Sequence, residues 1–475
     1  MPAMHRRSFL KRSAAAGVGL VAASEYARAV GSNDRLRIAV LGVNGRGKSH
    51  VSAYSGMKDV EVSVIVDPDL RVVGVPVKEA ESRQGKAPAT LQDLRKMLED
   101  KSVDAVSIAT PNHWHSLATI WSCEAGKDVY VEKPCSHNVW EGRRAVETAR
   151  RHRRIVQHGT QSRSSSDVRG AIEQVRAGKI GKVLVARGLC YKPRESIGVR
   201  QPEAPPQELD FNVWLGPARE QPYHGNLVHY NWHWMWDTGN GDIGNQGVHE
   251  MDVARWGLGA GLPKAVASFG GRFGYQDQGQ TANTQVVLFD YGDAQLIFEV
   301  RGLPTRELLG VKIGNIFHGT EGTLVVGRGI YRKGSSRPEP IPPSTQGGDH
   351  FRNFIDAARS RKTEDLRADI LDGHLSSALC HLANISYRLG SDEPFHGRLG
   401  DLSVDAATRE ALGRTEEHLA MQGVKLEEQT LRVGRRLVVD PEKEKFVDSN
   451  DANALLTREY RKPFVPEGAV ATTAR

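Results

Sequence analysis

The feature that most constrains the fold is an alternation of short apolar runs and helical stretches that begins at Arg37. The apolar runs are rich in Val and Ile and are bounded by turn residues, as expected of parallel strands buried on both faces. The predicted strands are Arg37–Leu41, Val60–Val66, Val103–Ala109, Asp128–Val131 and Ile155–Gln157. The predicted helices between them are Lys48–Met57, Leu91–Leu98, His115–Ala125 and Trp140–His152. Such alternation predicts a doubly wound parallel α/β sheet, which we assign to residues 35–160.

The pattern changes after a connecting helix predicted at Ser164–Gly178. Strand candidates then follow one another with few helices between them, which favours a mostly antiparallel sheet in an α+β domain at residues 161–400. These candidates are Gly181–Tyr191, Ala265–Phe273, Asn283–Asp290, Ala294–Glu299, Lys312–His318 and Thr323–Val326. Helices predicted at Asp349–Ser360 and Asp369–Leu389 are expected to return to the first domain. Residues 401–475 are assigned as a charged C-terminal extension, irregular from about Gly413 onward.

The first 29 residues have the pattern of a twin-arginine export signal. Paired arginines lie in His5–Lys11, the weakly apolar run Ala14–Ala23 follows, and Ala27–Ala29 forms a small-x-small cleavage site. The apolar run is too short to span a bilayer, so no stable membrane anchor is expected. The sequence therefore predicts export to the periplasm or beyond by the twin-arginine machinery. That route carries folded proteins, so a tightly held cofactor could be loaded before export.

The excess of positive charge does not indicate a nucleic-acid-binding protein. The formal net charge is +7, and five basic residues against one acid place +4 of it in the first 29 residues. The remaining +3 is small for a body of this size, so we expect no nucleic-acid partner. Four cysteines without C-x-x-C spacing are interpreted as buried free thiols, and no metal site is predicted.

A glycine-rich turn directly follows the first predicted strand. It contains Gly42, Asn44, Gly45, Arg46 and Gly47 and opens a helix. Such turns let a pyrophosphate approach backbone N–H groups at a helix N-terminus. Asn in place of the second glycine of G-x-G-x-x-G keeps the turn, because Asn tolerates left-handed backbone conformations.

An acid follows this turn at the distance typical of a dinucleotide fold. Asp67 ends the second predicted strand and could accept both ribose hydroxyls of adenosine, which favours NAD. The nearby Arg71 leaves NADP open as an alternative cofactor. The structural alternative is an Asp that only initiates a turn before Pro68.

The end of the third long strand carries a second polar group, Ala109–His115. Ligands bind beyond the carboxyl ends of parallel strands, so Thr110, Pro111, Asn112 and His115 are predicted to line the cofactor. Trp114 is a candidate for ring stacking. The alternative role for Asn112 is helix capping. The H-x-H spacing lacks the nearby acid or cysteine that would complete a metal site.

Two further motifs supply candidates for proton chemistry. Glu132-Lys133-Pro134 places a lysine at the end of a buried strand, where a purely structural lysine would be out of place. Lys133 could hydrogen-bond and polarise a substrate hydroxyl, while Glu132 could face the nicotinamide ribose. The glycine-rich segment Gly239–Asp252 runs into a helix that starts near His249.

Together these motifs resemble the glucose-fructose oxidoreductase/inositol dehydrogenase/MocA (Gfo/Idh/MocA) family over roughly residues 35–400. The resemblance implies a two-domain, NAD(P)-dependent oxidoreductase of sugars or polyols, and a homo-oligomer. It carries the family's lysine and histidine over to Lys133 and His249. The family commonly has Asp four residues before the histidine, where this chain has Asn245, which cannot accept a proton at neutral pH. Asp252 or Asp242 could orient His249 instead. The chain most resembles the exported, twin-arginine branch of the family.

An aromatic cluster interleaved with histidines lies between Tyr223 and Trp236. Trp faces stack on sugar C–H surfaces, so Trp232 and Trp234 are predicted to bind a carbohydrate, with ordinary core packing as the alternative. Lys192, Arg194 and Asp242 are further substrate-binding candidates, and His249 is expected to contact the reacting hydroxyl.

These features favour an NAD(P)-dependent oxidoreductase acting on a hydroxyl of a sugar, glycoside or polyol. Outside the cytoplasm no free NAD pool exists, so a trapped cofactor must be recycled within the reaction. The alternative is therefore a redox-neutral enzyme that cleaves or isomerises a glycoside through a transient keto sugar. A third hypothesis is a non-catalytic sugar-binding or redox-sensing protein, which Asn245 supports and which the intact Lys133 and His249 oppose.

Overall fold

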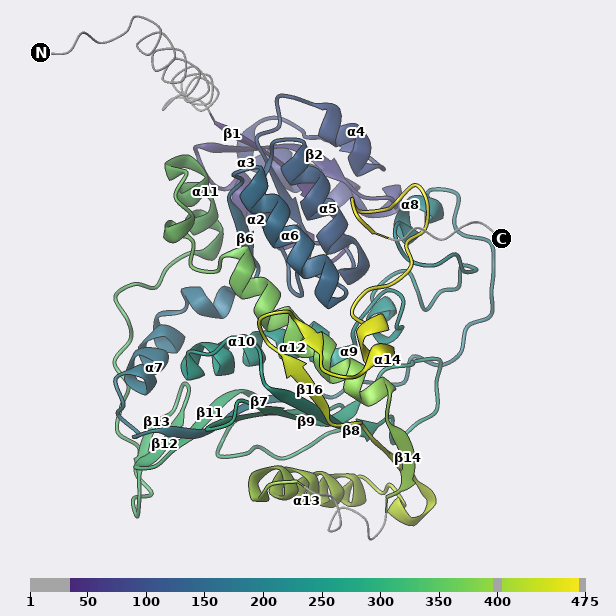
Figure 1. Cartoon of the computed structure of the whole chain (residues 1–475). Coiled ribbons are helices and arrows are strands. Elements are labelled where there is room, and N and C mark those ends of the chain that lie inside the picture. Colours follow the sequence, from purple (N-terminus) through teal and green to yellow (C-terminus); the bar gives the residue numbers. More distant parts are fainter. Residues whose placement is uncertain (1–34, 396–403, 470–475) are drawn as a thin grey trace, which may run out of the picture.

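A computed structural model describes residues 35–395 and 404–469. A parallel sheet with its helices forms the upper part of the molecule, and a long second sheet spreads below it (Figure 1). The predicted export signal at residues 1–29 lies outside the described residues and stays a prediction.

The upper sheet is fully parallel and has the strand order β3-β2-β1-β4-β5-β6. Its strands are β1 (Leu36–Leu41), β2 (Val60–Val66), β3 (Ala89–Leu91), β4 (Ala105–Ile108), β5 (Asp128–Val131) and β6 (Val156–His158). Its helices are α2 (Arg46–Ser55), α3 (Gly74–Gln84), α4 (Leu94–Glu99), α5 (Asn112–Glu124) and α6 (Val139–Arg151). Strand order reverses between β1 and β4, and the crevice at such a switch point binds ligands in doubly wound folds.

Two elements of this unit are absent from the sequence prediction. Helix α3 buries only Pro76 and Ala80, so its sequence carries almost no apolar periodicity. Strand β3 is three residues long and has no fully buried residue. Both lie at the periphery, where little burial is available to pattern the sequence.

The lower sheet is mostly antiparallel, and the predicted fold class is thereby confirmed. Its main path runs β13-β12-β11-β7-β10-β9-β8-β15-β14, and among the described strand pairs only β7 with β10 is parallel. Its first strands are β7 (Val183–Tyr191), β8 (Ala265–Gly271), β9 (Thr284–Asp290), β10 (Gln295–Arg301), β11 (Ile313–Gly319), β12 (Gly322–Val325) and β13 (Gly329–Arg332). The later strands are β14 (Ser391–Pro394), β15 (Thr430–Val433), β16 (Leu437–Asp440) and β17 (Lys445–Phe446).

Helices join the two sheets. Those of the second unit are α7 (Ser166–Arg176), α8 (Phe211–Leu215), α9 (Gly241–Asn245), α10 (Gly247–Leu258), α11 (His350–Ser360), α12 (Ile370–Arg388), α13 (Ala406–Met421) and α14 (Asn450–Ala454). Helix α10 lies on β7, while α12 packs against both β8 and α6 of the upper unit (Figure 1). Helices α11 and α12, which were expected to return to the first domain, contact α2 and α6 respectively and hold the upper sheet over the lower one.

The C-terminal segment is not irregular, and the sequence prediction was wrong there. Helix α13 covers the lower face of the long sheet (Figure 1), where Leu412 and Leu419 pack with Phe269 and Leu288. Strand β15 extends the sheet beside β8, and Phe464 is buried in the upper unit. The charged segment has few apolar residues, and their partners lie more than a hundred residues earlier, so local periodicity does not reveal this packing.

Two simpler expectations concern the cysteines and the membrane. Cys123, Cys135, Cys190 and Cys380 are buried free thiols, as predicted. Within residues 35–395 and 404–469, every helix is too short or too polar to cross a bilayer.

Candidate active site

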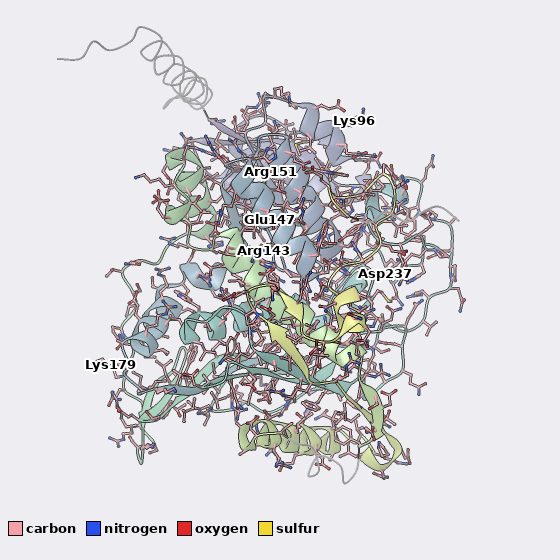
Figure 2. All side chains as sticks on the ribbon, viewed as in Figure 1. Lys96, Arg143, Glu147, Arg151, Lys179 and Asp237 are labelled. Carbon is pink, nitrogen blue, oxygen red and sulfur yellow. The ribbon has the colours of Figure 1, made fainter. Side chains whose placement is uncertain are left out.

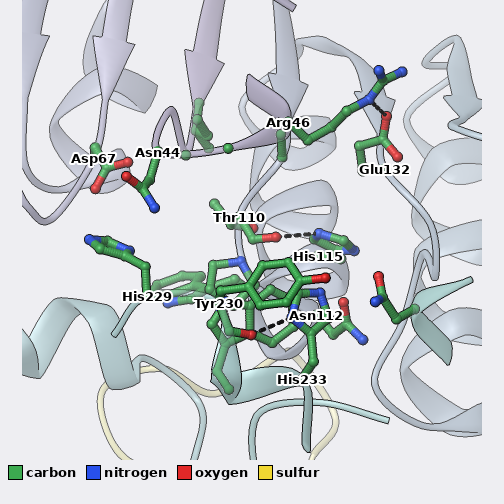
Figure 3. A pocket seen from close by; sticks show the side chains of 18 of the residues that line it. Asn44, Arg46, Asp67, Thr110, Asn112, His115, Glu132, His229, Tyr230 and His233 are labelled. Atoms are coloured by element: carbon green, nitrogen blue, oxygen red, sulfur yellow. Dashed lines mark hydrogen bonds and ion pairs between the residues drawn. The ribbon is translucent and has the colours of Figure 1, made fainter. Parts of the chain in front are cut away.

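A cavity of about 590 Å³ lies between the two units, at the carboxyl ends of β1, β2, β4 and β5. Side chains from both units line it (Figure 3). The predicted residues on its wall are Gly42, Asn44, Gly45, Arg46, Asp67, Thr110, Pro111, Asn112, His115, Glu132, Lys133, Lys192, Trp232, Asn245 and His249. The fold thus brings most of the candidate residues together, although they come from segments spread over some two hundred positions.

The glycine turn has the shape that a dinucleotide needs. Gly42 has φ +79°, and a Cβ there would lie 2.8 Å from the carbonyl oxygen of Ala109. A Cβ on Gly47 would lie 1.8 Å from the carbonyl oxygen of Gly42, so the second residue of α2 must be glycine where the helix packs against the turn. Gly45, in contrast, faces open space, which leaves room for a phosphate at the start of α2. These residues therefore fit the pyrophosphate of NAD.

Asp67 is buried beside this turn. Its carboxylate accepts hydrogen bonds from the backbone N–H of Val43 at 2.8 Å and of Asp69 at 3.0 Å. Burial raises the pKa of Asp67, and these two bonds oppose the rise. The carboxylate is thereby fixed at the end of β2, where the ribose of a dinucleotide lies in this fold.

Arg71, whose positive charge kept NADP as an alternative cofactor, is paired with Asp69. Its guanidinium makes a bidentate ion pair with Asp69, at 2.8 and 2.5 Å. The ring of His229, from the second unit, approaches the same carboxylate at 2.9 Å. Figure 3 shows His229 beneath Asp67, so the two units meet at this end of the cavity.

The Thr110–His115 segment forms the middle of the wall. Thr110 lies two residues after β4, and its buried hydroxyl oxygen has no hydrogen-bond partner in the part of the chain that the structure describes. Its carbonyl lies 2.7 Å from Nε2 of His115 (Figure 3). The other ring nitrogen of His115 lies 2.5 Å from the carbonyl of Pro134. Asn112 is the first residue of α5, after Pro111, and its amide donates to Asn240. Asn112 and His115 therefore tie this wall to neighbouring segments.

Trp114 does not present a free indole to a ligand. Its N–H donates to the carbonyl oxygens of Val213 and Trp214, at 3.1 and 3.0 Å. Its ring makes an edge contact with Phe464 of the C-terminal segment. Trp114 is anchored by this packing, and only part of it reaches the cavity wall.

Glu132 is the centre of a buried charge cluster. One of its oxygens accepts from Arg46 at 2.9 Å (Figure 3). The same oxygen accepts from Gln161 at 2.9 Å and lies 3.2 Å from Nε2 of His50. Burial alone would raise the pKa of Glu132, but His50 and Arg46 hold it well below its usual range. The carboxylate is therefore a compensated anion, and Arg46 is fixed beside the glycine turn by it.

Lys133 lies at the end of β5 and enters the same cavity. Its ammonium group donates to the backbone carbonyl of Asn245, at the end of α9. Burial lowers the pKa of Lys133, and the charge of Lys192 adds to this effect. Lys133 and Asn245, both predicted to be catalytic, are thus joined through the main chain of Asn245. The side chain of Asn245 is not needed for this bond.

His249 lies in the first turn of α10, on the cavity wall. Its Nδ1 is buried and has no hydrogen-bond partner in the described part of the chain, so Nε2 is the nitrogen available to a ligand. Burial, reinforced by the charge of Lys133, lowers the pKa of His249 to about 3. The ring is consequently neutral near pH 7 and can accept a proton.

Neither acid proposed to orient His249 does so. The carboxylate of Asp252 is held by Arg163 at 2.8 and 2.9 Å and by the hydroxyl of Ser376 at 2.7 Å. Asp242 accepts a bidentate pair from Arg194, at 2.8 and 2.5 Å. Helical spacing allowed both carboxylates to reach the histidine, but arginines from other elements have taken them.

The structure does not bring every substrate-binding candidate to the cavity. Arg194 and Asp242 pair with each other, and Arg194 also covers the ring of Trp234, which is only 5% exposed. These three residues lie behind the wall. Trp232 and Lys192 remain on it, and the Trp232 ring stacks on His233 at 3.6 Å.

Several lining residues were not among the predicted site residues. His229, Tyr230 and His233 lie on the wall from the second unit (Figure 3), and Gln161 and Gln246 complete it. The interleaved histidines of the aromatic cluster were a usable signal for the first three. Gln161 and Gln246 have no distinctive motif, and only the folded chain places them. Among residues 35–395 and 404–469, no group of three His, Cys, Asp or Glu residues is arranged to hold a metal ion.

Comparison with known proteins bears on this geometry. Two models of one family, GFO_IDH_MocA, match the chain: "Oxidoreductase family, NAD-binding Rossmann fold" over residues 36–160 and "Oxidoreductase family, C-terminal alpha/beta domain" over residues 190–409. The WlbA dehydrogenase from Bordetella pertussis, solved in complex with NADH and UDP-GlcNAcA, has a similar fold. Its TM-score is 0.56 at 20% identity, over 74% of this chain and 97% of that one.

Curated relatives share a shorter region. A glycosyl hydrolase family 109 protein of Shewanella baltica (strain OS185) is 31% identical over 204 residues, which cover 38% of this chain and 44% of that protein. An alpha-N-acetylgalactosaminidase of Shewanella oneidensis is 29% identical over 204 residues, which again cover 38% of this chain and 44% of that protein. The match thus spans less than half of these relatives. The paired family models, the two-sheet fold and the nucleotide-binding turn together show that the chain belongs to the Gfo/Idh/MocA oxidoreductase family, with an NAD-binding Rossmann domain.

Proposed function

We propose that the protein is an exported NAD-dependent oxidoreductase that oxidises a CH–OH group of a sugar, glycoside or polyol. The observation that carries the proposal is the convergence of Lys133 and His249 on the cavity that begins at the glycine turn. A lysine donor and a neutral histidine acceptor at one end of a dinucleotide cleft are the groups that alcohol oxidation requires.

The roles of the residues follow from their surroundings. NAD, when bound, supplies a hydride acceptor, and Gly42–Gly47 with Asp67 would hold it. His249 accepts the hydroxyl proton at Nε2, because its lowered pKa keeps the ring neutral. Lys133 donates a hydrogen bond to the same oxygen and stabilises the negative charge that develops there. Trp232 and Tyr230 provide an aromatic wall suited to the C–H face of a sugar ring.

Export shapes the proposed reaction. The twin-arginine pattern at residues 1–29 favours a periplasmic protein that carries its cofactor from the cytoplasm. The contact of His229 with Asp69 supports retention of NAD, because it joins the two units across the adenosine end of the cavity. A homo-oligomer, implied by the family, is part of the same proposal.

A second candidate is a redox-neutral glycosidase on the same scaffold. The names of the Shewanella relatives, glycosyl hydrolase family 109 protein and alpha-N-acetylgalactosaminidase, favour it. In such an enzyme the same Lys133 and His249 would form a transient keto sugar, and the glycosidic bond would break before the ketone is reduced again.

The test begins with the protein as purified from its export compartment. Denaturation of the protein should release one nicotinamide dinucleotide per chain, which mass spectrometry detects. Incubation with a panel of glycosides, with an artificial electron acceptor present, should then give a keto sugar. Release of the aglycone without net oxidation would favour the glycosidase. Absence of bound nicotinamide, together with no binding of added NAD, would refute both enzymes and favour a non-catalytic protein.

A further inference from the structure

The substrate end of the cavity is positively charged and has no anion on its wall. Lys133, Lys192 and His249 line this end. Among the described residues that line the cavity, the acids are Asp67 and Glu132, and both belong to the cofactor end. A ligand placed beside Lys133 and His249 therefore meets cationic and neutral groups only.

Two carboxylates around this end, Glu132 and Asp242, are engaged by arginines. Glu132 is bound by Arg46 at 2.9 Å, and Asp242 is bound by Arg194 at 2.8 Å. Each of these ion pairs is closed within the protein. The charge of Glu132 still opposes the lowering of the pKa of Lys133 by burial, whereas Lys192 has no ion pair within residues 35–395 and 404–469.

A further acid, Glu250, lies behind the wall on α10. It is 5% exposed, and one of its oxygens accepts from Gln246 at 3.1 Å. The other oxygen is buried and has no partner among the described residues. Burial raises the pKa of Glu250 to about 8, against the pull of Lys133 and Lys192. At pH 7 the carboxyl group is thus mostly protonated and does not neutralise the lysines.

Lys192 itself is free to bind a ligand. It directly follows β7, and within residues 35–395 and 404–469 its ammonium group makes no hydrogen bond or ion pair. An ammonium group kept partly out of water without a counter-ion is costly, and an anionic ligand removes this cost. Lysine is a compact point charge, suited to a carboxylate or a phosphate.

We infer that the substrate is an anionic sugar whose carboxylate or phosphate group binds Lys192, while the hydroxyl that reacts lies between Lys133 and His249. This inference rests on the proposed function and narrows its substrate class. The aromatic wall of Tyr230 and Trp232 binds the ring, and the charge fixes which end of the ring faces the lysine.

The test compares sugars that differ only in charge. Binding of D-glucuronate, D-glucose 6-phosphate and D-glucose, and of the galacto pair D-galacturonate and D-galactose, is measured by quenching of the fluorescence of bound NADH. At low ionic strength we expect an anionic sugar to bind at least about tenfold more tightly than its neutral partner, a difference expected of one close charge pair. Added salt should narrow the gap. The uronate and phosphate arms show which anion is preferred.

Lys192→Gln should lower the ratio of anionic to neutral affinity by about tenfold. Lys179→Gln is the matched control, because Lys179 is an exposed lysine four residues before β7 begins (Figure 2). This variant should leave the ratio unchanged. Equal binding of charged and neutral sugars by the native protein, or an unchanged ratio in Lys192→Gln, overturns the inference alone. Failure of every sugar to bind an NADH-loaded protein overturns the proposed function with it.

Discussion

The two ends of the central cavity treat charge in opposite ways. At the cofactor end, Glu132 forms an ion pair with Arg46 and contacts the ring of His50, and Asp69 forms an ion pair with Arg71 and contacts the ring of His229. At the substrate end, the hydrogen bond of the Lys133 ammonium group within the described residues goes to the backbone carbonyl of Asn245, and burial raises the pKa of the Glu250 carboxyl group on α10 to about 8. At the cofactor end, these pairs fix the side chains before a ligand binds, which suits a cofactor that stays bound. The substrate end keeps a positive field for the molecule that reacts, because its charges are not cancelled by the protein.

The strongest way to break this comparison is to remove the central cation of the substrate end. Lys133→Ala should reduce kcat by about a thousandfold, because the developing alkoxide loses the charged donor assigned to it. Bound nicotinamide, measured by mass spectrometry, should stay at its native level, since the cofactor end is untouched. Lys96→Ala, an exposed lysine on α4 (Figure 2), is the control. Appreciable turnover by the Lys133 variant would contradict its assignment.

The second test removes the proton acceptor. His249→Asn should lower kcat by about a hundredfold, with a smaller change in KM, because Nε2 acts on the reacting hydroxyl. Steady-state kinetics on the preferred sugar would show the split. His152→Asn, at the C-terminus of α6 and outside the cavity, should behave as the native protein. A change in KM alone would indicate that His249 only binds substrate.

The third test addresses the cofactor end. Asp67→Ser should weaken NAD binding by about tenfold and reduce the preference for NAD over NADP, because a carboxylate at the end of β2 binds the ribose hydroxyls and repels a 2′-phosphate. Titration of apoprotein with each dinucleotide measures both effects. Asp93→Ser, a half-buried N-cap in the same unit and outside the cavity, controls for general destabilisation. An unchanged NAD:NADP ratio would show that Asp67 only shapes the turn.

The smallest expected effect concerns the pH dependence of stability. Burial lowers the pKa of His249 to about 3 in the folded protein, against 6.5 when exposed in the unfolded chain. Between these values the unfolded state binds a proton that the folded state does not. Above pH 6.5 this histidine therefore does not change the free energy of unfolding with pH. As the pH drops from 6.5 toward 3, the free energy of unfolding falls by about 1 kcal/mol per pH unit.

Urea unfolding at several pH values between 4 and 7, compared for the native protein and His249→Asn, measures this slope. The variant should lose less stability per pH unit, by about 1 kcal/mol. Identical slopes in the two proteins would mean that His249 is accessible to protons in the folded state.

Prediction from sequence succeeded where a local pattern coincides with burial. Strand β2 was predicted at Val60–Val66, which are its observed limits, because seven residues of one texture lie between turns. Lys133 could be singled out because a lysine at the end of a fully buried strand conflicts with its surroundings. Helix α3, with little burial, and helix α13, whose partners are strands β8 and β9, gave no such local signal.

The candidate site shows the same division. Spacing along α10 placed Asp252 one helical turn from His249, yet spacing says nothing of Arg163, which approaches from another segment and takes the carboxylate. In the same way Arg194 and Asp242 looked like separate substrate contacts and proved to be partners. Competition for a charged group is decided by elements far apart in the chain.

By itself, therefore, the sequence determined the two-sheet fold class, the nucleotide turn and the motif residues Lys133 and His249, because each depends on neighbours a few positions away. Only the tertiary structure decided which charges are cancelled. It paired Glu132, Asp242 and Asp252 with arginines and left Lys192 without a partner among the described residues. The reason is physical: an ion pair depends on distance in space, and the packing of the two units sets that distance.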